Sequence, residues 1–311
     1  MYSMENAQPG GMPARLPRYQ RVPNYPPVKI TPPRLRILEA IAQFDYLSAP
    51  QLARLLLRST SLTYVEQDLK ELFHGKWVRR VFLPRSEPGG SPLAIYSLDN
   101  DAVALLRRQG NGPVGRFHAG EQAERERLFL KHTLEANDLL ILAKQVERRQ
   151  LGVTIAKLRP ERELKRARIY VDVAHTKLPV VPDGWVDFRY DGRQICVAFE
   201  LDRGTEDRRV FQRKIEGLVR YADGPYQAAF DTESITVAFV TTAAGARLRE
   251  MLGWTERTLN ELHLQQWHDL FWFAAFDPAR ADPVDVFLAP WWVRPFHPER
   301  RALLEEAPEE A

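Results

Sequence analysis

Apolar positions at helical spacing, followed by an alternating stretch, organise the first third of the chain. Helical patterns begin after Thr31 and after Ser48, which are both good N-cap residues, and a third pattern runs over residues 61–74 and stops at Gly75. Residues 78–98 alternate between apolar and polar on both sides of a Glu-Pro-Gly-Gly turn, which is typical of a β-hairpin. Three helices and a hairpin in this order predict a winged helix-turn-helix.

A winged helix predicts binding to double-stranded DNA. The first turn of its third helix faces base edges in the major groove, and the hairpin flanks the phosphate backbone. The candidate contacts are Arg58, Thr60, Ser61, Thr63, Tyr64 and Gln67 around the helix, and Arg79, Arg80 and Arg85 on the hairpin. The alternative is a protein-docking module, because acidic residues dilute the basic face of the helix at Glu66, Asp68 and Glu71.

The remainder of the chain predicts a mixed α/β domain. A long helical pattern without internal Gly or Pro begins near residue 121, and from residue 151 short apolar runs alternate with helical patterns near 207–222 and 244–260. The fold class is therefore α/β, or α+β overall, with a winged helix followed by a mixed-sheet domain. The predicted segments are a Pro-rich disordered arm (1–30), the winged helix (31–110), a linker (111–120), the α/β domain (121–300) and an acidic tail (301–311).

Composition and charge narrow the class of protein. The 311 residues are 44% hydrophobic and 27% charged, as in soluble globular proteins. One cysteine excludes an internal disulfide framework, and no apolar run is long enough to span a membrane, so we expect a cytoplasmic protein. Residues 1–110 carry 15 Lys and Arg against 9 Asp and Glu, a balance of +6, whereas the rest carries 29 against 32, a balance of −3. The basic first part favours a polyanionic partner.

Carboxylates gather at the end of one apolar strand pattern. The runs WVDFRY and QICVAFELD flank an Asp-Gly pair that predicts a two-residue hairpin turn. Antiparallel pairing then brings Asp183, before the first run, close to Glu200 and Asp202 at the end of the second. Three converging carboxylates repel one another unless a cation lies among them, and Mg²⁺ or Mn²⁺ suits such oxygen ligands. Glu135 on the long helix is a candidate fourth ligand.

The same residues resemble a known pattern. Pro-Asp followed by Glu-x-Asp resembles the motif of the PD-(D/E)xK nuclease fold, and Asp183 and Glu200 are 17 positions apart (200 − 183). More specifically, VPDG, FELDRGTE and FQRKIEGLVRYAD resemble the replication-relaxation family of bacterial plasmids and other mobile elements. The resemblance covers the winged-helix region, HTLEANDLL and most of the α/β domain. It implies DNA association and a role in replication or transfer of the element.

The chain departs from the nuclease pattern at one position. Asp202 stands where the motif normally has lysine, and Lys214 on the following helix is the candidate replacement, since lysine migration onto that helix is known for the fold. The catalytic candidates, if the domain is active, are therefore Asp183, Glu200, Asp202 and Lys214. Each also has a structural explanation, such as local pairing of Asp202 with Arg203. His132 is explained more simply as a core or capping histidine than as a ligand.

Three functions follow from these patterns. Because the motif lysine is displaced, the preferred one is a DNA-binding protein of plasmid or mobile-element replication or transfer with a degenerate nuclease-like domain. The second is a Mg²⁺-dependent DNA endonuclease directed by the winged helix, with Mg²⁺ or Mn²⁺ as cofactor. The third is an adaptor that docks replication or transfer proteins. None of them involves a membrane.

Overall fold

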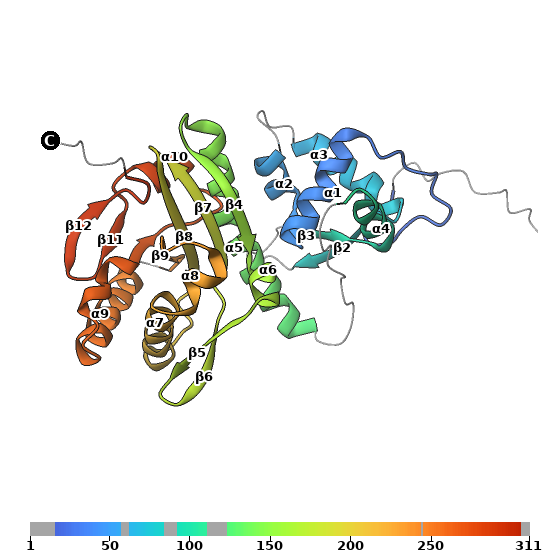
Figure 1. Ribbon diagram of the computed structural model, residues 1–311. Helices are drawn as coiled ribbons and strands as arrows, with labels where there is room; N and C mark the ends of the chain where they lie inside the picture. Colours follow the sequence, from blue (N-terminus) through green and yellow to red (C-terminus); the bar gives the residue numbers. More distant parts are fainter. Residues whose placement is uncertain (1–15, 57–61, 84–91, 111–122, 244, 306–311) are drawn as a thin grey trace, which may run out of the picture. The chain divides into compact units, whose positions relative to one another are not determined.

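The chain forms two compact units, residues 1–119 and 120–311. The computed structural model describes residues 16–56, 62–83, 92–110, 123–243 and 245–305 (Figure 1). The predicted linker, residues 111–120, lies outside these ranges.

The first unit has the predicted helices and hairpin in the predicted order. Strands β1, β3 and β2 form an antiparallel sheet in that spatial order, with Val78 paired with Leu98. Leu38, Leu52 and Leu69, one from each of the first three helices, are fully buried and share one core. The elements are α1 (Pro32–Phe44), β1 (Leu47–Ser48), α2 (Ala49–Leu56), α3 (Leu62–His74), β2 (Val78–Leu83), β3 (Leu93–Leu98) and α4 (Asn100–Arg108).

The prediction of a disordered arm over residues 1–30 is wrong for residues 16–30. Arg21 donates hydrogen bonds to the backbone carbonyls of Phe73, at 2.9 Å, and Val78, at 2.8 Å, and forms an ion pair with Asp99 at 2.7 Å. These contacts are made by a charged side chain to backbone oxygens, so apolar periodicity gives no signal of them. Residues 1–15 lie outside the described part of the chain.

The second unit is built on a seven-stranded mixed sheet in the spatial order β12-β11-β10-β9-β8-β7-β4. The pairs β4–β7 and β7–β8 are antiparallel, the pairs β8–β9 and β9–β10 are parallel, and β10–β11 and β11–β12 are again antiparallel. The strands of the sheet are β4 (Thr154–Pro160), β7 (Gly184–Tyr190), β8 (Arg193–Asp202), β9 (Thr236–Thr241), β10 (Phe271–Ala275), β11 (Trp292–Arg294) and β12 (His297–Arg301).

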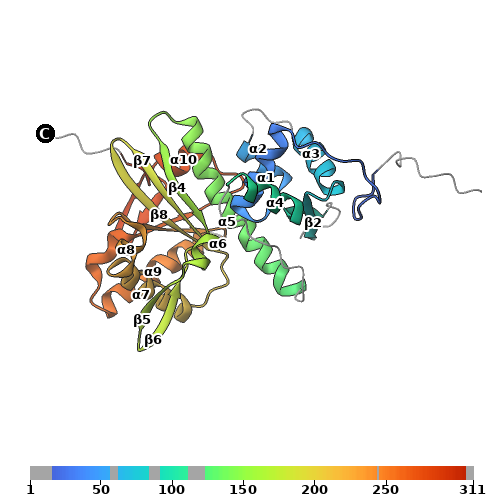
Figure 2. The same cartoon turned by 45° about the vertical axis from the view of Figure 1, so that its right-hand side comes forward.

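Helices cover both faces of this sheet (Figures 1 and 2). On one face Gly184 lies so close to α5 that a Cβ atom there would meet Leu140 at 2.8 Å, and Phe199 contacts Phe287 of α10. The opposite face packs Ala198 of β8 in one core with α7 and α9. The helices are α5 (Ala123–Arg149), α6 (Glu161–Arg166), α7 (Arg208–Ala222), α8 (Pro225–Phe230), α9 (Gly245–Glu261), the 3₁₀ helix η1 (Gln265–Leu270) and α10 (Pro283–Leu288).

Two elements differ from the sequence expectation. The apolar run near residue 170 joins no large sheet, because β5 (Ile169–Val173) pairs only with β6 (Thr176–Val180) in a hairpin that packs on α7. Leu178 of this hairpin approaches Gly217 so closely that a Cβ atom on the glycine would lie 2.7 Å from it. The predicted acidic tail begins too early, since Leu303 and Leu304 are buried.

The packed N-terminal segment gives a stability prediction. Replacing Arg21 with Ala leaves the Phe73 and Val78 carbonyls and the Asp99 carboxylate with fewer donors, so the first unit should lose about 1–3 kcal/mol of unfolding free energy. Urea dependence of amide hydrogen exchange in β2 and β3 measures this loss. Arg36→Ala, at an exposed position of α1, is the control and should change stability by less than about 0.5 kcal/mol. Equal effects of the two substitutions would contradict the anchoring role.

Candidate functional site

The β7–β8 hairpin places two acidic residues side by side. Gly184 pairs with Phe199, and the amide of Asp183 donates to the Phe199 carbonyl at 2.9 Å, so Asp183 lies beside Glu200 on the adjacent strand. This is the register that the Asp-Gly turn predicts. The side chain of Asp183 turns back to accept a hydrogen bond from the Leu201 amide at 2.8 Å. The strand pairing therefore fixes both residues without help from any ligand.

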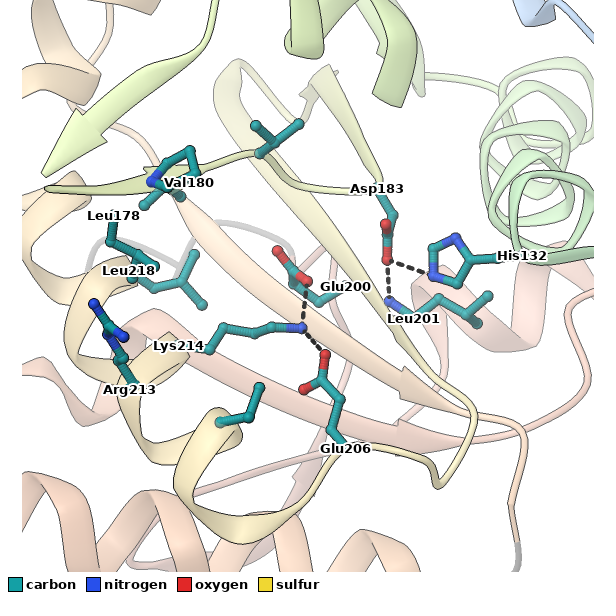
Figure 3. A pocket seen from close by; sticks show the side chains of 13 residues that line it. His132, Leu178, Val180, Asp183, Glu200, Leu201, Glu206, Arg213, Lys214 and Leu218 are labelled. Atoms are coloured by element: carbon teal, nitrogen blue, oxygen red, sulfur yellow. Dashed lines mark hydrogen bonds and ion pairs between the residues drawn. The ribbon is translucent and has the colours of Figure 1, made fainter. Parts of the chain in front are cut away.

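Both carboxylates line a cavity of about 370 Å³. Figure 3 shows it between α7, the β8 strand and the segment that leads from β6 to β7. We call it the acid–lysine pocket. Its polar lining is His132, Asp183, Glu200, Glu206, Arg213 and Lys214, and its apolar lining is Leu178, Pro179, Val180, Val181, Leu201, Val210 and Leu218.

Lys214 comes from α7 and lies between two of the carboxylates. Its Nζ atom is 3.3 Å from Glu200 Oε2 and 2.5 Å from Glu206 Oε1 (Figure 3). On α7 it stands three residues after Phe211 and four before Leu218, and both of these side chains are buried. Helical periodicity therefore aims Lys214 toward the sheet. The structure thus brings Lys214 within contact of Glu200, and its catalytic role stays a prediction.

Burial controls the charge state of the pocket. It raises the pKa of Asp183 to about 7, with the negative charge of Glu161 adding to the effect. It also raises the pKa of Glu200, to about 8, although Lys214 acts in the opposite direction. Burial alone would lower the pKa of Lys214, but Glu200 and Glu206 outweigh it and hold the ammonium in its charged form. A second positive charge in the pocket would let both buried carboxyls ionise.

His132 was not expected in the site. It belongs to α5, and its Nε2 atom is 3.5 Å from Asp183 Oδ2 (Figure 3). Its side chain lines the acid–lysine pocket on the opposite side of Asp183 from Lys214. Its place in the stretch HTLEANDLL, which carries part of the family resemblance, was the available signal.

Asp202 does not belong to the pocket, which corrects its assignment as a ligand or catalytic residue. Its side chain is 3% exposed and both carboxylate oxygens are engaged by Arg247 of α9, at 2.9 Å from Nε and 2.8 Å from Nη2. It also accepts from Thr241 Oγ1 at 3.1 Å and from the Gly204 amide at 2.9 Å. Burial raises the pKa of Asp202, but the hydrogen bonds from Arg247 lower it below its usual value. We call this pair the Asp202–Arg247 ion pair.

Glu135 is also outside the pocket lining. Its Oε2 atom is 3.1 Å from Arg203 Nε, and its Oε1 atom is 3.9 Å from Lys131. Among the described residues, no group of three or more His, Cys, Asp or Glu side chains is placed to share a metal ion. Three carboxylates line the pocket: Lys214 contacts Glu206 at 2.5 Å and Glu200 at 3.3 Å, and Asp183 lies outside its reach, so Asp183 and Glu200 are the two that could hold a cation.

The first unit presents fewer of the predicted DNA contacts than expected. Thr63, Tyr64 and Gln67 are exposed on α3. Arg79 instead pairs with Asp99 at 3.1 Å, and Arg80 donates to the Arg18 carbonyl. The other candidates, Arg58, Thr60, Ser61 and Arg85, lie outside the described residues.

Arg80 also stacks on two aromatic rings of the first unit. Its guanidinium lies 3.9 Å from the centre of the Phe73 ring and 5.5 Å from that of Phe82. The positive charge of the guanidinium is attracted to the faces of these rings, which favours this position of the side chain. Arg79 and Arg80 thus both have partners inside the first unit, and their contacts with the DNA backbone stay predictions.

Comparison with known proteins shows the family to which the chain belongs. Residues 38–237 match the model of the family described as Replication-relaxation. A search of curated proteins gave no match. Among solved structures, restriction endonuclease FokI is similar at 12% identity with a TM-score of 0.23, over 81% of this chain and 43% of that one. The chain thus spans less than half of that nuclease, and a likeness at this score carries no argument.

No helix in the described ranges is both long and apolar enough to cross a membrane.

The Asp202–Arg247 ion pair gives a prediction that separates a structural role from a ligand role. Asp202→Asn removes the buried countercharge of Arg247 and leaves only the exposed Glu250 at 3.4 Å, so the unfolding free energy of the second unit should fall by about 3–5 kcal/mol. Urea unfolding measures it. Arg149→Ala, which breaks the exposed pair with Asp282, should cost less than about 1 kcal/mol. If Asp202 were a cation ligand instead, the Asn variant would keep its stability and lose cation binding.

Proposed function

The chain belongs to the replication-relaxation family, and from this premise we propose that it binds DNA during replication or transfer of a plasmid or other mobile element. We propose further that its second unit cleaves phosphodiester bonds with the help of Mg²⁺ or Mn²⁺ in the acid–lysine pocket. The first unit, a winged helix, would direct the protein to double-stranded DNA through the exposed surface of α3.

The observation that carries the proposal is the position of Lys214. Displacement of the motif lysine was the reason to regard the nuclease-like domain as degenerate. The structure supports a different view, because Lys214 reaches Glu200 from α7 with its Nζ atom 3.3 Å from the carboxylate. An ammonium group at this place can stabilise negative charge that develops on a phosphoryl group.

The carboxylates suit a single hard cation. Asp183 and Glu200 are about nine-tenths buried and lie beside each other, and within the described residues neither Asp183 Oδ1 nor Glu200 Oε1 accepts a hydrogen bond. Mg²⁺ binds through one or two carboxylates and completes its shell with water and substrate phosphate oxygens. When bound, such a cation supplies charge to polarise the phosphodiester.

The residues of the chain have distinct roles in this proposal. Asp183 and Glu200 hold the cation, and Lys214 contributes the charge that the nuclease motif places two residues after the glutamate. Glu206 is a positioning residue, since it holds the Lys214 ammonium at 2.5 Å and is itself fixed through its backbone carbonyl by Arg247 at 2.9 Å. His132 orients Asp183 from the side of α5.

A second candidate is DNA binding without cleavage. It is favoured by the contact of Lys214 with both Glu200 and Glu206, because this ammonium already offsets part of the negative charge. The pocket would then be a structural ion-pair cluster, and the protein would bind DNA or dock replication proteins only.

Plasmid nicking tests the proposed activity. We expect the wild-type protein to convert supercoiled plasmid to open circles with Mg²⁺ or Mn²⁺ and not with EDTA. Asp183→Ala/Glu200→Ala should abolish nicking, and Lys214→Met should slow it by about 100-fold or more, as for removal of one charge-stabilising donor. Gel resolution of the plasmid forms measures the rates.

Two controls make the nicking result specific. Lys214→Arg keeps a positive charge and should retain more activity than Lys214→Met. Glu216→Ala, on α7 outside the acid–lysine pocket, should nick at the wild-type rate. Retardation of DNA by the wild type without any metal-dependent nicking would instead support the second candidate.

The raised carboxyl pKa values predict how stability depends on pH. Asp183 and Glu200 titrate near pH 4 in the unfolded chain but near 7 and 8 when folded, so the folded state holds more protons between these values. The contribution of these two groups to the free energy of unfolding should therefore be most favourable at low pH and become less favourable as pH rises from about 4 to 8. Mn²⁺ should restore it at pH 8 and have little effect at pH 5, where the carboxyls are protonated.

Thermal unfolding at the two pH values, with and without Mn²⁺, measures this dependence. Asp183→Asn/Glu200→Gln removes both titrating groups, so its melting temperature should lack this fall with pH and the Mn²⁺ effect. An equal Mn²⁺ shift in the wild type and this variant would show that the cation binds elsewhere.

A further inference from the structure

The burial of the Asp183 and Glu200 carboxylates limits which substrate groups can contact them. Asp183 is 9% exposed and Glu200 6% exposed, so neither lies on an open surface. A phosphate of a regular duplex can enter such a cavity only if the duplex is deformed, which costs energy. Access to the acid–lysine pocket therefore requires a substrate group that can enter the cavity.

The walls of the pocket are those of a nucleotide-sized site. Its volume of about 370 Å³ is near the lower end of the range of roughly 300–1,000 Å³ that holds small molecules. Leu178 and Val180 of the β5–β6 hairpin and Leu218 of α7 provide apolar surface in the pocket (Figure 3), and Val210 of α7 also lines it. A sugar or base packs on such a surface, whereas a phosphate backbone alone gains nothing from it.

One positively charged side chain, that of Arg213, lies at the entrance of the acid–lysine pocket. Arg213 precedes Lys214 on α7, lines the pocket and is exposed. Within the described residues it makes no hydrogen bond or ion pair, in contrast to Lys214, so its guanidinium is available to an incoming anion. Arg213 can hold a phosphate that neighbours the one inside the pocket, because a guanidinium binds phosphate oxygens in a planar fork.

We infer that the acid–lysine pocket takes one unpaired nucleotide, so that its substrate is single-stranded or locally unpaired DNA, with Arg213 binding a flanking phosphate. This inference rests on the proposed function and adds the substrate class. Duplex DNA would be bound by the first unit, and strand separation would deliver the nucleotide to the second. Extrusion of a paired base costs a few kcal/mol, which selects for sites that are already open.

The experiment measures binding in EDTA, where no metal-dependent cleavage occurs. Fluorescence anisotropy compares three labelled DNAs of one sequence: a single strand, a full duplex, and a duplex with a short unpaired bubble. Arg213→Ala should weaken binding of the single strand and bubble about fivefold at 0.1 M salt and lower the salt slope by about 0.7, the effect of one lost phosphate contact. Duplex binding should stay unchanged.

A second variant tests the cavity itself. Val210 is 52% exposed at the pocket rim, so Val210→Trp should fill the entrance without disturbing the core and should weaken single-strand binding while leaving duplex binding intact. The matched controls are Leu151→Trp, at a position that is 94% exposed, and Arg249→Ala, at an exposed position of α9 outside the pocket lining. Both should bind all three DNAs as the wild type does.

The outcomes distinguish this inference from the proposed activity. If Arg213→Ala and Val210→Trp each weakened single-strand and duplex binding to the same extent, the unpaired-nucleotide site would be overturned, whether or not nicking is seen. The same holds if neither variant changed the binding of any of the DNAs. Selective loss on the unpaired DNAs would support it even if no metal-dependent nicking occurs, in which case only the hydrolytic function fails. Nicking of fully paired linear duplex by Val210→Trp at the wild-type rate would also overturn it.

Discussion

The pairing of β7 with β8 is the constraint on which the second unit depends. It buries Asp183 beside Glu200, and two carboxylates in that position cannot both ionise without nearby positive charge. Lys214 supplies part of this charge from α7, and it can do so only because the core between α7 and the sheet holds that helix in place. The positions of these charged groups therefore follow from the strand pairing and the packing of α7.

The Asp202–Arg247 ion pair holds together the chain segments next to the acid–lysine pocket. Asp202 closes β8, Thr241 closes the parallel strand β9, and Arg247 starts α9, so one buried carboxylate joins the ends of three elements. The same arginine also binds the Glu206 carbonyl. The loop after β8 is thereby held in the position from which Glu206 reaches Lys214. A change far from the carboxylates of the pocket can thus alter the placement of the lysine.

The sequence predicts the strands and the register of the site but not its ion pairs. Alternation and an Asp-Gly turn are local signals, and they were sufficient to place Asp183 beside Glu200, whereas Lys214 was named only from the resemblance to the nuclease fold. Arg247 lies 45 residues after Asp202, and no local pattern links a buried arginine to its partner. The same limit applies to Arg79, whose ion pair with Asp99, 20 residues later, no local pattern indicates. Long-range pairing of charged residues depends on the packed fold.

The presence of Asp202 at the position where the PD-(D/E)xK motif normally has lysine has a physical explanation. Glu200 and Asp202 point to the same side of the sheet, but the strand carries the second residue about 7 Å further along, to its end. A lysine at that end would compete with Arg247 for the space between β8 and α9, whereas a lysine on α7 approaches Glu200 from above the sheet. The requirement of the site is a positive charge beside the buried glutamate, and the backbone position that delivers it is free to change. A missing motif lysine is therefore not evidence of an inactive site until the neighbouring helix has been considered.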